Sequence, residues 1–88
     1  MNWVCELTQQ AENDLKQLPR HIQERVSRTL SSMESDPFQG NVTALKGAEW
    51  KGVFRRSIGS YRILFVPDQQ SKIVTAVRIL LRSEKTYR

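Results

Sequence analysis

The apolar residues of this chain change their spacing once, from helical repeats before residue 34 to strand-like alternation after residue 52. Ala11, Leu15 and Leu18 follow one another at i, i+4 and i+7, which is one stripe of an amphipathic helix. A second stripe at helical spacing consists of Ile22, Val26, Leu30 and Met33. Two such stripes need apolar cover, and the alternating segments that follow predict a sheet that supplies it.

Helix-breaking residues set the bounds of the two predicted helices. Thr8 has the hydroxyl of a good N-cap, and Pro19 ends the first helix. The second helix is predicted from Arg20 to Glu34 and stops at the turn-forming run Ser35-Asp36-Pro37. The short break between the helices predicts a helical hairpin.

Short β-branched and aromatic runs between turn residues predict the strands. One strand opens the chain, and three later strands form an antiparallel meander. The glycine-rich stretch before the meander predicts a loop with a short strand near Thr43 to Lys46. The four main strands are Trp3 to Leu7, Gly52 to Ser57, Tyr61 to Val66 and Lys72 to Leu80. The order βααβββ predicts an α+β fold in which a helical hairpin covers one face of an antiparallel sheet, in a single domain over residues 1–88.

Alternation along the strands predicts which side chains share a face. The face toward the helices is expected to take Phe54, Tyr61, Ile63, Phe65, Ile73, Val77 and Ile79. The opposite, open face is expected to carry Val53, Arg55, Arg62, Leu64, Val66, Arg78, Leu80 and Arg82. Three strands thus direct arginines to one side of the sheet, which favours a bound phosphate over mere solvation of a one-sided sheet.

The overall charge favours the same kind of partner. Lys and Arg number 14 against nine Asp and Glu, which gives a net charge of +5 and a pI of about 9.9. Such a surplus favours a polyanion, with nucleic acid as the first candidate and an acidic protein that masks the same surface as the second. A basic protein that is merely soluble is the alternative.

Several other classes of function lack their residues in this sequence. The single cysteine, Cys5, excludes an intrachain disulfide and agrees with a reducing cytoplasm. One His and one Cys cannot build a metal site of the usual kind, so neither a metal nor another cofactor is expected. No apolar stretch approaches the ~20 residues of a membrane span, and the N-terminus has no export signal, so a cytoplasmic protein is expected.

Four segments in a fixed order carry a family resemblance. They are T-x-x-A-x-x-D-L-x-x-L-P from Thr8 to Pro19, L-K-G from Leu45 to Gly47, F-R-R-S-I-G-S-Y-R-I-L-F from Phe54 to Phe65, and R-S-E-K-T-Y-R from Arg82 to Arg88. With these segments the chain resembles the RelE/ParE toxin superfamily over nearly its whole length. The element G-x-Y-R-I at Gly59 to Ile63 is the most specific, but it does not separate the nuclease branch from the gyrase-poison branch.

The resemblance to RelE-like toxins implies a RelE-like microbial ribonuclease-type fold and a metal-independent endoribonuclease that cuts messenger RNA in the decoding site of the ribosome. The ribose 2′-hydroxyl would attack the adjacent phosphate and leave a 3′ phosphate, cyclic or opened, and a 5′-hydroxyl. Guanidinium groups suit such a transition state because they stabilise negative charge on the phosphoryl oxygens where water is excluded.

The resemblance also implies roles for individual residues. Arg62 and Arg82 are expected to stabilise the transition state, and Arg55 to orient the phosphate, since an arginine stays protonated. Tyr87 matches the C-terminal tyrosine that many RelE-like nucleases use in proton transfer; its alternative role is to tie down the tail. Further RNA contacts are expected from Lys46, Lys51, Arg56, Arg78 and Lys85.

Two departures from the family pattern leave the division of labour open. The spacing from Arg82 to Tyr87 is one residue shorter than in the best-known nucleases of this kind. Val53 stands where such enzymes often have a second lysine, which leaves the missing charge to Lys51, Arg56 or Lys85.

The resemblance further implies a cognate antitoxin that joins this chain in a hetero-oligomer. Such a partner should offer an amphipathic helix to exposed apolar surface and acidic groups to the arginines. The main rival is a ParE-like toxin that binds and poisons DNA gyrase without nuclease activity. The set of basic residues and the terminal tyrosine favour the nuclease, and an inactive relic that only supports a regulatory complex is a third alternative.

Overall fold

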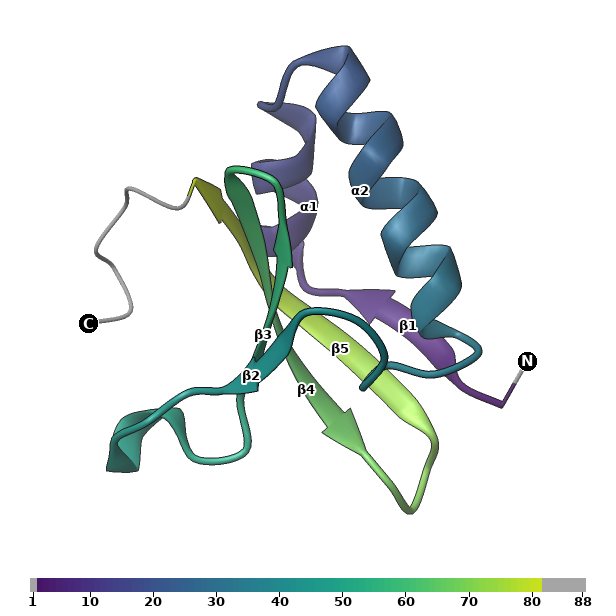
Figure 1. The fold of residues 1–88 in the computed structure, drawn as a ribbon, viewed down its shortest axis with the longest axis vertical. Helices are drawn as coiled ribbons and strands as arrows, with labels where there is room; N and C mark the ends of the chain where they lie inside the picture. The colour runs from purple at the N-terminus through teal and green to yellow at the C-terminus, as the bar shows by residue number, and fades with distance from the viewer. Residues whose placement is uncertain (1, 82–88) are drawn as a thin grey trace.

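In the computed structural model, which describes residues 2–81, two helices lie on one face of a five-stranded sheet (Figure 1). The helices are α1 (Gln9–Lys16) and α2 (Arg20–Met33), and a short 3-10 helix, η1 (Ala48–Trp50), lies between two strands. The strands are β1 (Val4–Leu7), β2 (Val42–Ala44), β3 (Phe54–Ile58), β4 (Tyr61–Asp68) and β5 (Ile73–Leu81). The predicted α+β class and the helical hairpin are confirmed.

The start of α1 is fixed by the side chain predicted to cap it. The Thr8 Oγ1 atom accepts a hydrogen bond from the Ala11 N–H at 3.1 Å. The same hydroxyl donates to the Val77 carbonyl at 3.2 Å, so the cap also ties the helix to β5. Pro19 precedes the first residue of α2 with φ −55°, and it separates the two helices as expected.

The sheet differs from the prediction in the pairing of its first strand. The strand order is β1-β5-β4-β3-β2, and the pairs from β5 to β2 are antiparallel. The β1 and β5 strands pair in parallel, with Cys5 beside Val74. The expected antiparallel sheet is therefore wrong at this pair, because the helical crossover after β1 lets the first and last strands run in the same direction. The short strand expected near Thr43 is confirmed as β2 and makes the sheet five-stranded.

A β-bulge in β5 changes which residues face the helices. Phe65 pairs with Ala76, but the preceding Leu64 pairs with Arg78, so Val77 is an extra residue in the strand. One extra residue reverses the alternation of side chains on the two sides of the bulge.

The reversal corrects two of the predicted core positions. Val74 and Ala76 fill the helix side with 0% exposure, and Ile79 does so beyond the bulge with 2% exposure. Ile73 pairs with Asp68 one position before Val74 and lies in the rows of the open face. The expectation that Ile73 and Val77 face the helices is therefore wrong, since the prediction assumed unbroken alternation.

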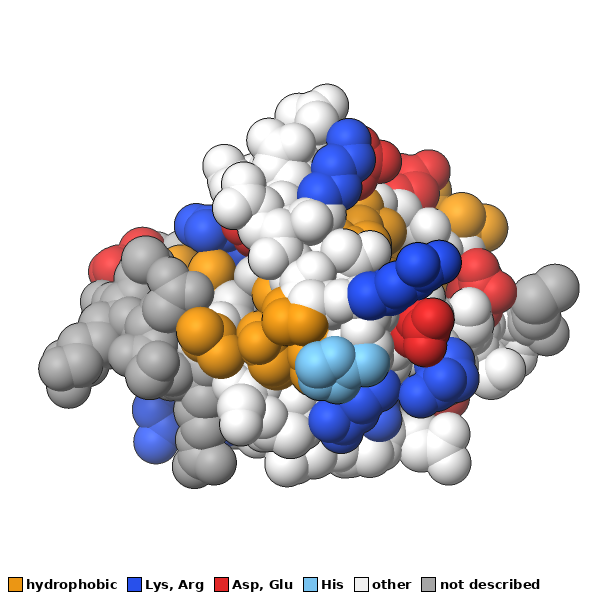
Figure 2. Space-filling view, turned by 90° about the horizontal axis from the view of Figure 1, so that it is seen from above, with side chains coloured by type: hydrophobic (Ala, Val, Ile, Leu, Met, Phe, Trp, Pro, Cys, Tyr) orange, Lys and Arg blue, Asp and Glu red, His pale blue; other side chains and the backbone are white. Residues whose placement is uncertain are grey.

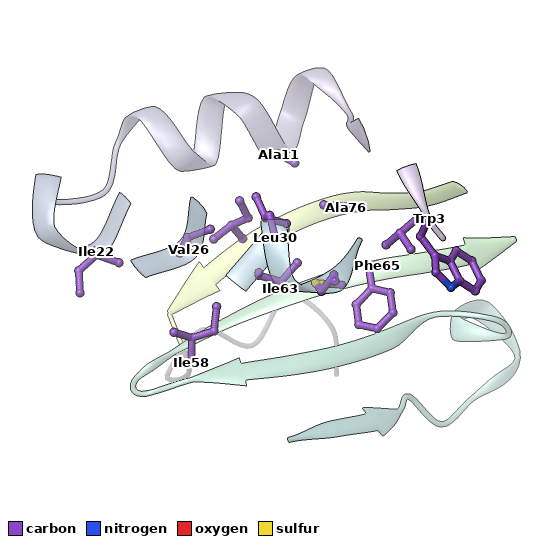
Figure 3. Close-up of a cluster of buried hydrophobic side chains, with 12 residues drawn as sticks. Trp3, Ala11, Ile22, Val26, Leu30, Ile58, Ile63, Phe65 and Ala76 are labelled. Carbon is purple, nitrogen blue, oxygen red and sulfur yellow. The ribbon is translucent and has the colours of Figure 1, made fainter. Parts of the chain in front are cut away.

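The core fills the space between the helices and the sheet, where side chains from both layers point toward one another (Figure 3). An aromatic row extends this core: the Phe38 ring lies 6.1 Å from the Trp3 ring and 5.6 Å from the Phe54 ring. Phe54 in turn stacks on Phe65 at 5.9 Å. The buried members of the core are Trp3, Ala11, Ile22, Val26, Leu30, Met33, Ile58, Ile63, Phe65, Val74, Ala76 and Ile79.

Candidate functional site

The strand register places two arginines together on the open face. Arg55 of β3 lies opposite Leu64 of β4, and Arg62 of β4 lies opposite Ser57 of β3. Since Ile63 belongs to the core, its neighbours Arg62 and Leu64 point to the other side of the sheet, away from both helices. Arg55 and Arg62 are therefore diagonal neighbours, a relation that separates Cα atoms by ~7–8 Å. Two guanidinium groups on stems of this length can reach a single phosphate.

Two buried leucines lie beside these arginines on the same face. Leu64 is 1% exposed and has Arg55 and Arg78 as its cross-strand partners, and Leu80 is 3% exposed and lies opposite Arg62. Neither leucine belongs to the core beneath the helices. Arginine stems are long enough to cover apolar neighbours while the guanidinium groups stay outside. The guanidinium groups therefore lie beside apolar side chains, and the low local dielectric there strengthens their attraction for an anion.

The charges of the open face are segregated along the strands. Glu6 and Val66 both pair with Thr75, so Glu6 lies level with Val66 across the sheet. Val66 is four positions along β4 from Arg62, a distance of ~13 Å at ~3.3 Å per residue. Asp68 lies farther still, at the end of β4. At the other end, the Nε atom of Arg55 is buried and has no hydrogen-bond partner within residues 2–81. An anion bound there would satisfy a donor that is costly to leave unpaired.

Lys46 and Lys51 are exposed on the loop between β2 and β3, which projects away from the helices in Figure 1. Gly47 has a φ of 103° in this loop, a conformation that favours glycine. Lys51 stands three positions before the first residue of β3 and four positions before Arg55. The two lysines therefore extend the basic surface beyond the strand ends and do not join the arginine pair itself.

Arg78, expected to contact RNA, is instead held by a carboxylate. Its Nε donates to Asp14 Oδ2 at 2.8 Å, and its Nη2 donates to Asp14 Oδ1 at 3.3 Å. Arg78 follows the bulge, in the part of β5 that extends beyond β1 and contacts α1. Arg78 lies opposite Leu64, on the face that alternation predicted, and its guanidinium group is paired with Asp14.

Asp14 also completes the backbone pairing of β5. Because β1 ends opposite Ala76, β5 has an unpaired edge beyond that residue, and the Ile79 N–H donates to Asp14 Oδ2 at 3.0 Å. Burial alone would raise the pKa of Asp14, but the hydrogen bonds from Arg78, Ile79 and Gln10 outweigh it and hold this pKa below its ordinary value. Sequence reasoning did not single out Asp14, because its partners lie 64 and 65 positions away and leave no local signal.

Arg56, also expected to contact RNA, lies on the face opposite Arg55. It pairs with Ile63 and therefore points to the helix side of the sheet. Its Nη1 donates to the carbonyl of Gln39. A Cβ atom on Gly40 would lie 2.6 Å from the same Nη1, so glycine at this position leaves the space that the guanidinium group fills.

Three further predicted residues, Arg82, Lys85 and Tyr87, lie outside the described residues. Within residues 2–81, no three His, Cys, Asp or Glu side chains gather in a way that could hold a metal ion. None of the described helices has the length and apolarity needed to cross a membrane.

One comparison with known proteins shows the family, and a comparison with solved structures shows the fold. The sequence matches the family described as "ParE toxin of type II toxin-antitoxin system, parDE" over residues 5–86. The structure is similar to a chain of the RelBE2 toxin-antitoxin complex of Mycobacterium tuberculosis, with a TM-score of 0.82 and 24% identity, over 93% of this chain and 100% of that chain. A comparison with curated proteins finds no match.

Two more solved structures are similar over most of their length. A chain of the archaeal RelE-RelB complex from Pyrococcus horikoshii has a TM-score of 0.81 and 20% identity, over 97% of this chain and 100% of that chain. The isolated E. coli RelE toxin has a TM-score of 0.75 and 13% identity, over 96% of this chain and 88% of that chain. At these identities the likeness shows the fold, whereas the family match spans nearly the whole sequence. The chain therefore belongs to the ParE toxin family of the RelE/ParE superfamily and is the toxin of a type II toxin-antitoxin system.

Proposed function

We propose that this toxin is a metal-independent endoribonuclease that cuts messenger RNA on the translating ribosome. The observation that carries the proposal is the placement of Arg55 and Arg62 as diagonal neighbours on the face opposite the helices, beside the buried Leu64. The similarity of the fold to RelE toxins supports the same activity.

The reaction needs no group beyond the RNA and protein side chains. The ribose 2′-oxygen forms a bond to phosphorus as it loses its proton, and the bond from phosphorus to the 5′-oxygen breaks as that oxygen gains one. The products are a 2′,3′-cyclic phosphate and a 5′-hydroxyl. Arg62 stabilises the charge that gathers on the phosphoryl oxygens, and Arg55 orients the phosphate through its planar fork of donors.

Residues beyond the described part complete this proposal. Arg82 supplies a second guanidinium group to the phosphoryl oxygens, and Tyr87 transfers a proton to or from a ribose oxygen. Lys85, together with Lys46 and Lys51 of the β2–β3 loop, contacts the phosphates that flank the cut.

An antitoxin restrains this activity in the same proposal. Two of the similar structures are complexes of RelE with RelB or of RelBE2. An acidic, amphipathic segment of a cognate antitoxin would oppose Arg55 and Arg62 and cover apolar surface. Because the proposed substrate is messenger RNA on the ribosome, the toxin would act in the cytoplasm.

A second candidate function follows from the family match itself. Because that family is described as ParE toxins, binding and poisoning of DNA gyrase without nuclease activity is the alternative. In the proposed nuclease Arg62 acts on the scissile phosphate, so substitution of Arg62 should abolish or slow RNA cleavage, whereas inhibition of gyrase would be read in a separate reaction.

The test is to add the purified toxin to a translating extract and to a gyrase supercoiling reaction in parallel, and to map the 5′ ends of the messenger. We expect site-specific cuts that Arg62→Ala slows about 100- to 1,000-fold and Arg20→Ala leaves intact, with supercoiling unaffected. Arg20 is the matched control because it is an exposed arginine at the start of α2. Intact messenger together with arrested gyrase would overturn the nuclease and favour the alternative.

A further inference from the structure

A second basic cluster lies on the helix side of the sheet, between α2 and the turn that joins β3 to β4. It lines a pocket of about 350 Å³ whose walls include Arg25 and Arg28 of α2 and Arg56 of β3. These residues belong to neither the arginine pair of the open face nor the β2–β3 loop. The pocket therefore needs an explanation of its own.

The local sequence builds this pocket from three directions. Arg25 and Arg28 are three residues apart and so lie on the same side of α2. Gly59, in the β3–β4 turn, has a φ of 56°, and a Cβ atom there would lie 3.2 Å from the Nη1 atom of Arg25. Glycine at this position thus lets the Arg25 guanidinium group lie over the turn. Arg56 is held in place by its hydrogen bond to the Gln39 carbonyl.

The pocket carries positive charge without compensation from its own walls. None of the described residues that line it is acidic. The Thr29 hydroxyl donates to the Arg25 carbonyl at 3.0 Å, so its proton is used within the helix. The Nε atom of Arg56 is buried and has no hydrogen-bond partner within residues 2–81. The guanidinium groups repel one another and are the donors that the pocket offers to an anion.

Arg25 and Arg28 are exposed on α2. Basic side chains adjoin the single histidine, His21, in Figure 2. Arg25 follows His21 by one helical turn on α2, and Arg28 follows by two. The cluster therefore lies on surface that a large ligand can reach.

We propose that Arg25, Arg28 and Arg56 bind a phosphate of an RNA backbone, on the side of the sheet opposite Arg55 and Arg62. The inference rests on the proposed function for its choice of RNA as partner. Arg55 and Arg56 are consecutive in β3 and point to opposite faces, so RNA held in the pocket lies behind the strand that orients the cut. The site anchors RNA and takes no part in cleavage.

The walls favour a nucleic-acid phosphate over an acidic protein segment. Ile58 is the single apolar side chain among the described lining residues, and it is only 7% exposed. A protein partner would therefore bury little apolar surface here, whereas a phosphodiester needs only charge and donors.

The experiment uses the full chain and a 2′-O-methyl RNA oligonucleotide, which cannot be cut because it lacks the attacking hydroxyl. Arginine Nε–Hε NMR signals are followed during titration with this RNA, with inorganic phosphate and with a glutamate-rich peptide. Arg28→Gln is compared with Arg20→Gln, which removes the same charge from the same helix outside the pocket. Affinity is measured across a series of salt concentrations.

We expect RNA and phosphate to shift the Arg25, Arg28 and Arg56 signals in a saturable way. Arg28→Gln should weaken RNA binding about five- to tenfold and lower the slope of log K against log salt by ~0.7, the value for one phosphate of a single strand. Arg20→Gln should change affinity by less than about twofold. Equal losses in the two variants, or shifts with the peptide alone, would overturn the proposal. Since no outcome depends on cleavage, a failure of the nuclease in the Arg62 test is distinguishable from a failure of this site.

Discussion

Replacement of Asp14 by Asn tests whether the Asp14–Arg78 pair joins α1 to the edge of β5. The Asp14 side chain is 12% exposed and that of Arg78 is 34% exposed, so the pair is only partly screened by solvent. Hydrogen bonds to charged groups contribute ~1.5–3 kcal/mol each, and partial exposure of Arg78 reduces that figure. The amide also loses the charge that favours the Ile79 N–H. We therefore expect Asp14→Asn to lower the free energy of unfolding by about 2 kcal/mol.

Urea denaturation followed by circular dichroism measures this loss. A loss of about 2 kcal/mol corresponds to a Tm lower by about 8–16 °C for a chain of this size. A double-mutant cycle with Arg78→Gln should give a coupling free energy of about 1 kcal/mol or more. Glu24→Gln, at an exposed position of α2, is the control and should stay within about 0.5 kcal/mol of wild type. Additive effects of the two substitutions, or an Asp14→Asn variant as stable as the control, would refute the reasoning.

Three further predictions concern pH, backbone geometry and thiol reactivity. Because the pKa of Asp14 is lowered in the folded chain, its contribution to stability is complete above about pH 5 and is lost as the pH falls through the lowered pKa. The stability gap between wild type and Asp14→Asn should therefore narrow as the pH falls below about 5, and a constant gap would contradict this. Gly40→Ala should lower the free energy of unfolding in urea by about 1 kcal/mol or more beyond the loss caused by Gly52→Ala. Both glycines have a positive φ, but only at Gly40 would a Cβ atom meet the Arg56 side chain. Equal losses in the two variants would show that this contact is unimportant. Burial, with Glu34 and Glu6 nearby, raises the pKa of Cys5 from 9.0 to about 11. A thiol reagent at pH 8 should therefore label the folded chain about 100-fold more slowly than the unfolded chain, because the reagent reacts with the thiolate. Similar labelling rates in the two states would contradict the burial of Cys5.

The parts of the fold that sequence patterns predicted are those governed by local rules. The Thr8 cap, the break between the helices and the helical stripes depend on residues a few positions apart, and the structure confirms them, although the first helix ends at Lys16, before Pro19. The parallel pairing of β1 with β5 joins the two ends of the chain and has no local signal. The bulge at Val77 has none either, since the residue itself fits an unbroken strand.

The candidate site shows the same division between local and distant effects. Arg55 and Arg62 lie on strands joined by a two-residue turn, so simple alternation placed both on the open face correctly. Arg78 follows the bulge and meets a carboxylate from α1, which alternation could not anticipate. Arg56 was considered for its charge alone, and its pairing with Ile63 turns it toward α2. The count of charged residues predicted a surface that binds a polyanion, but only the strand register shows that Arg55 and Arg56 lie on opposite faces of the sheet.

The chemistry of the cut RNA ends tests the proposed nuclease most directly. A messenger on translating ribosomes is incubated with wild type, Arg62→Lys and Arg62→Ala, after urea denaturation has shown that all three are folded. Attack by the 2′-hydroxyl predicts 5′-hydroxyl ends that accept a label only after treatment with a kinase, together with cyclic or opened 3′ phosphates. Arg62→Ala should slow the formation of these ends about 100- to 1,000-fold. The rate of Arg62→Lys should lie between those of Arg62→Ala and wild type, because lysine keeps the positive charge but lacks the planar set of donors of the guanidinium group. Ends that carry a 5′ phosphate, or cleavage by Arg62→Ala at the wild-type rate, would contradict the account.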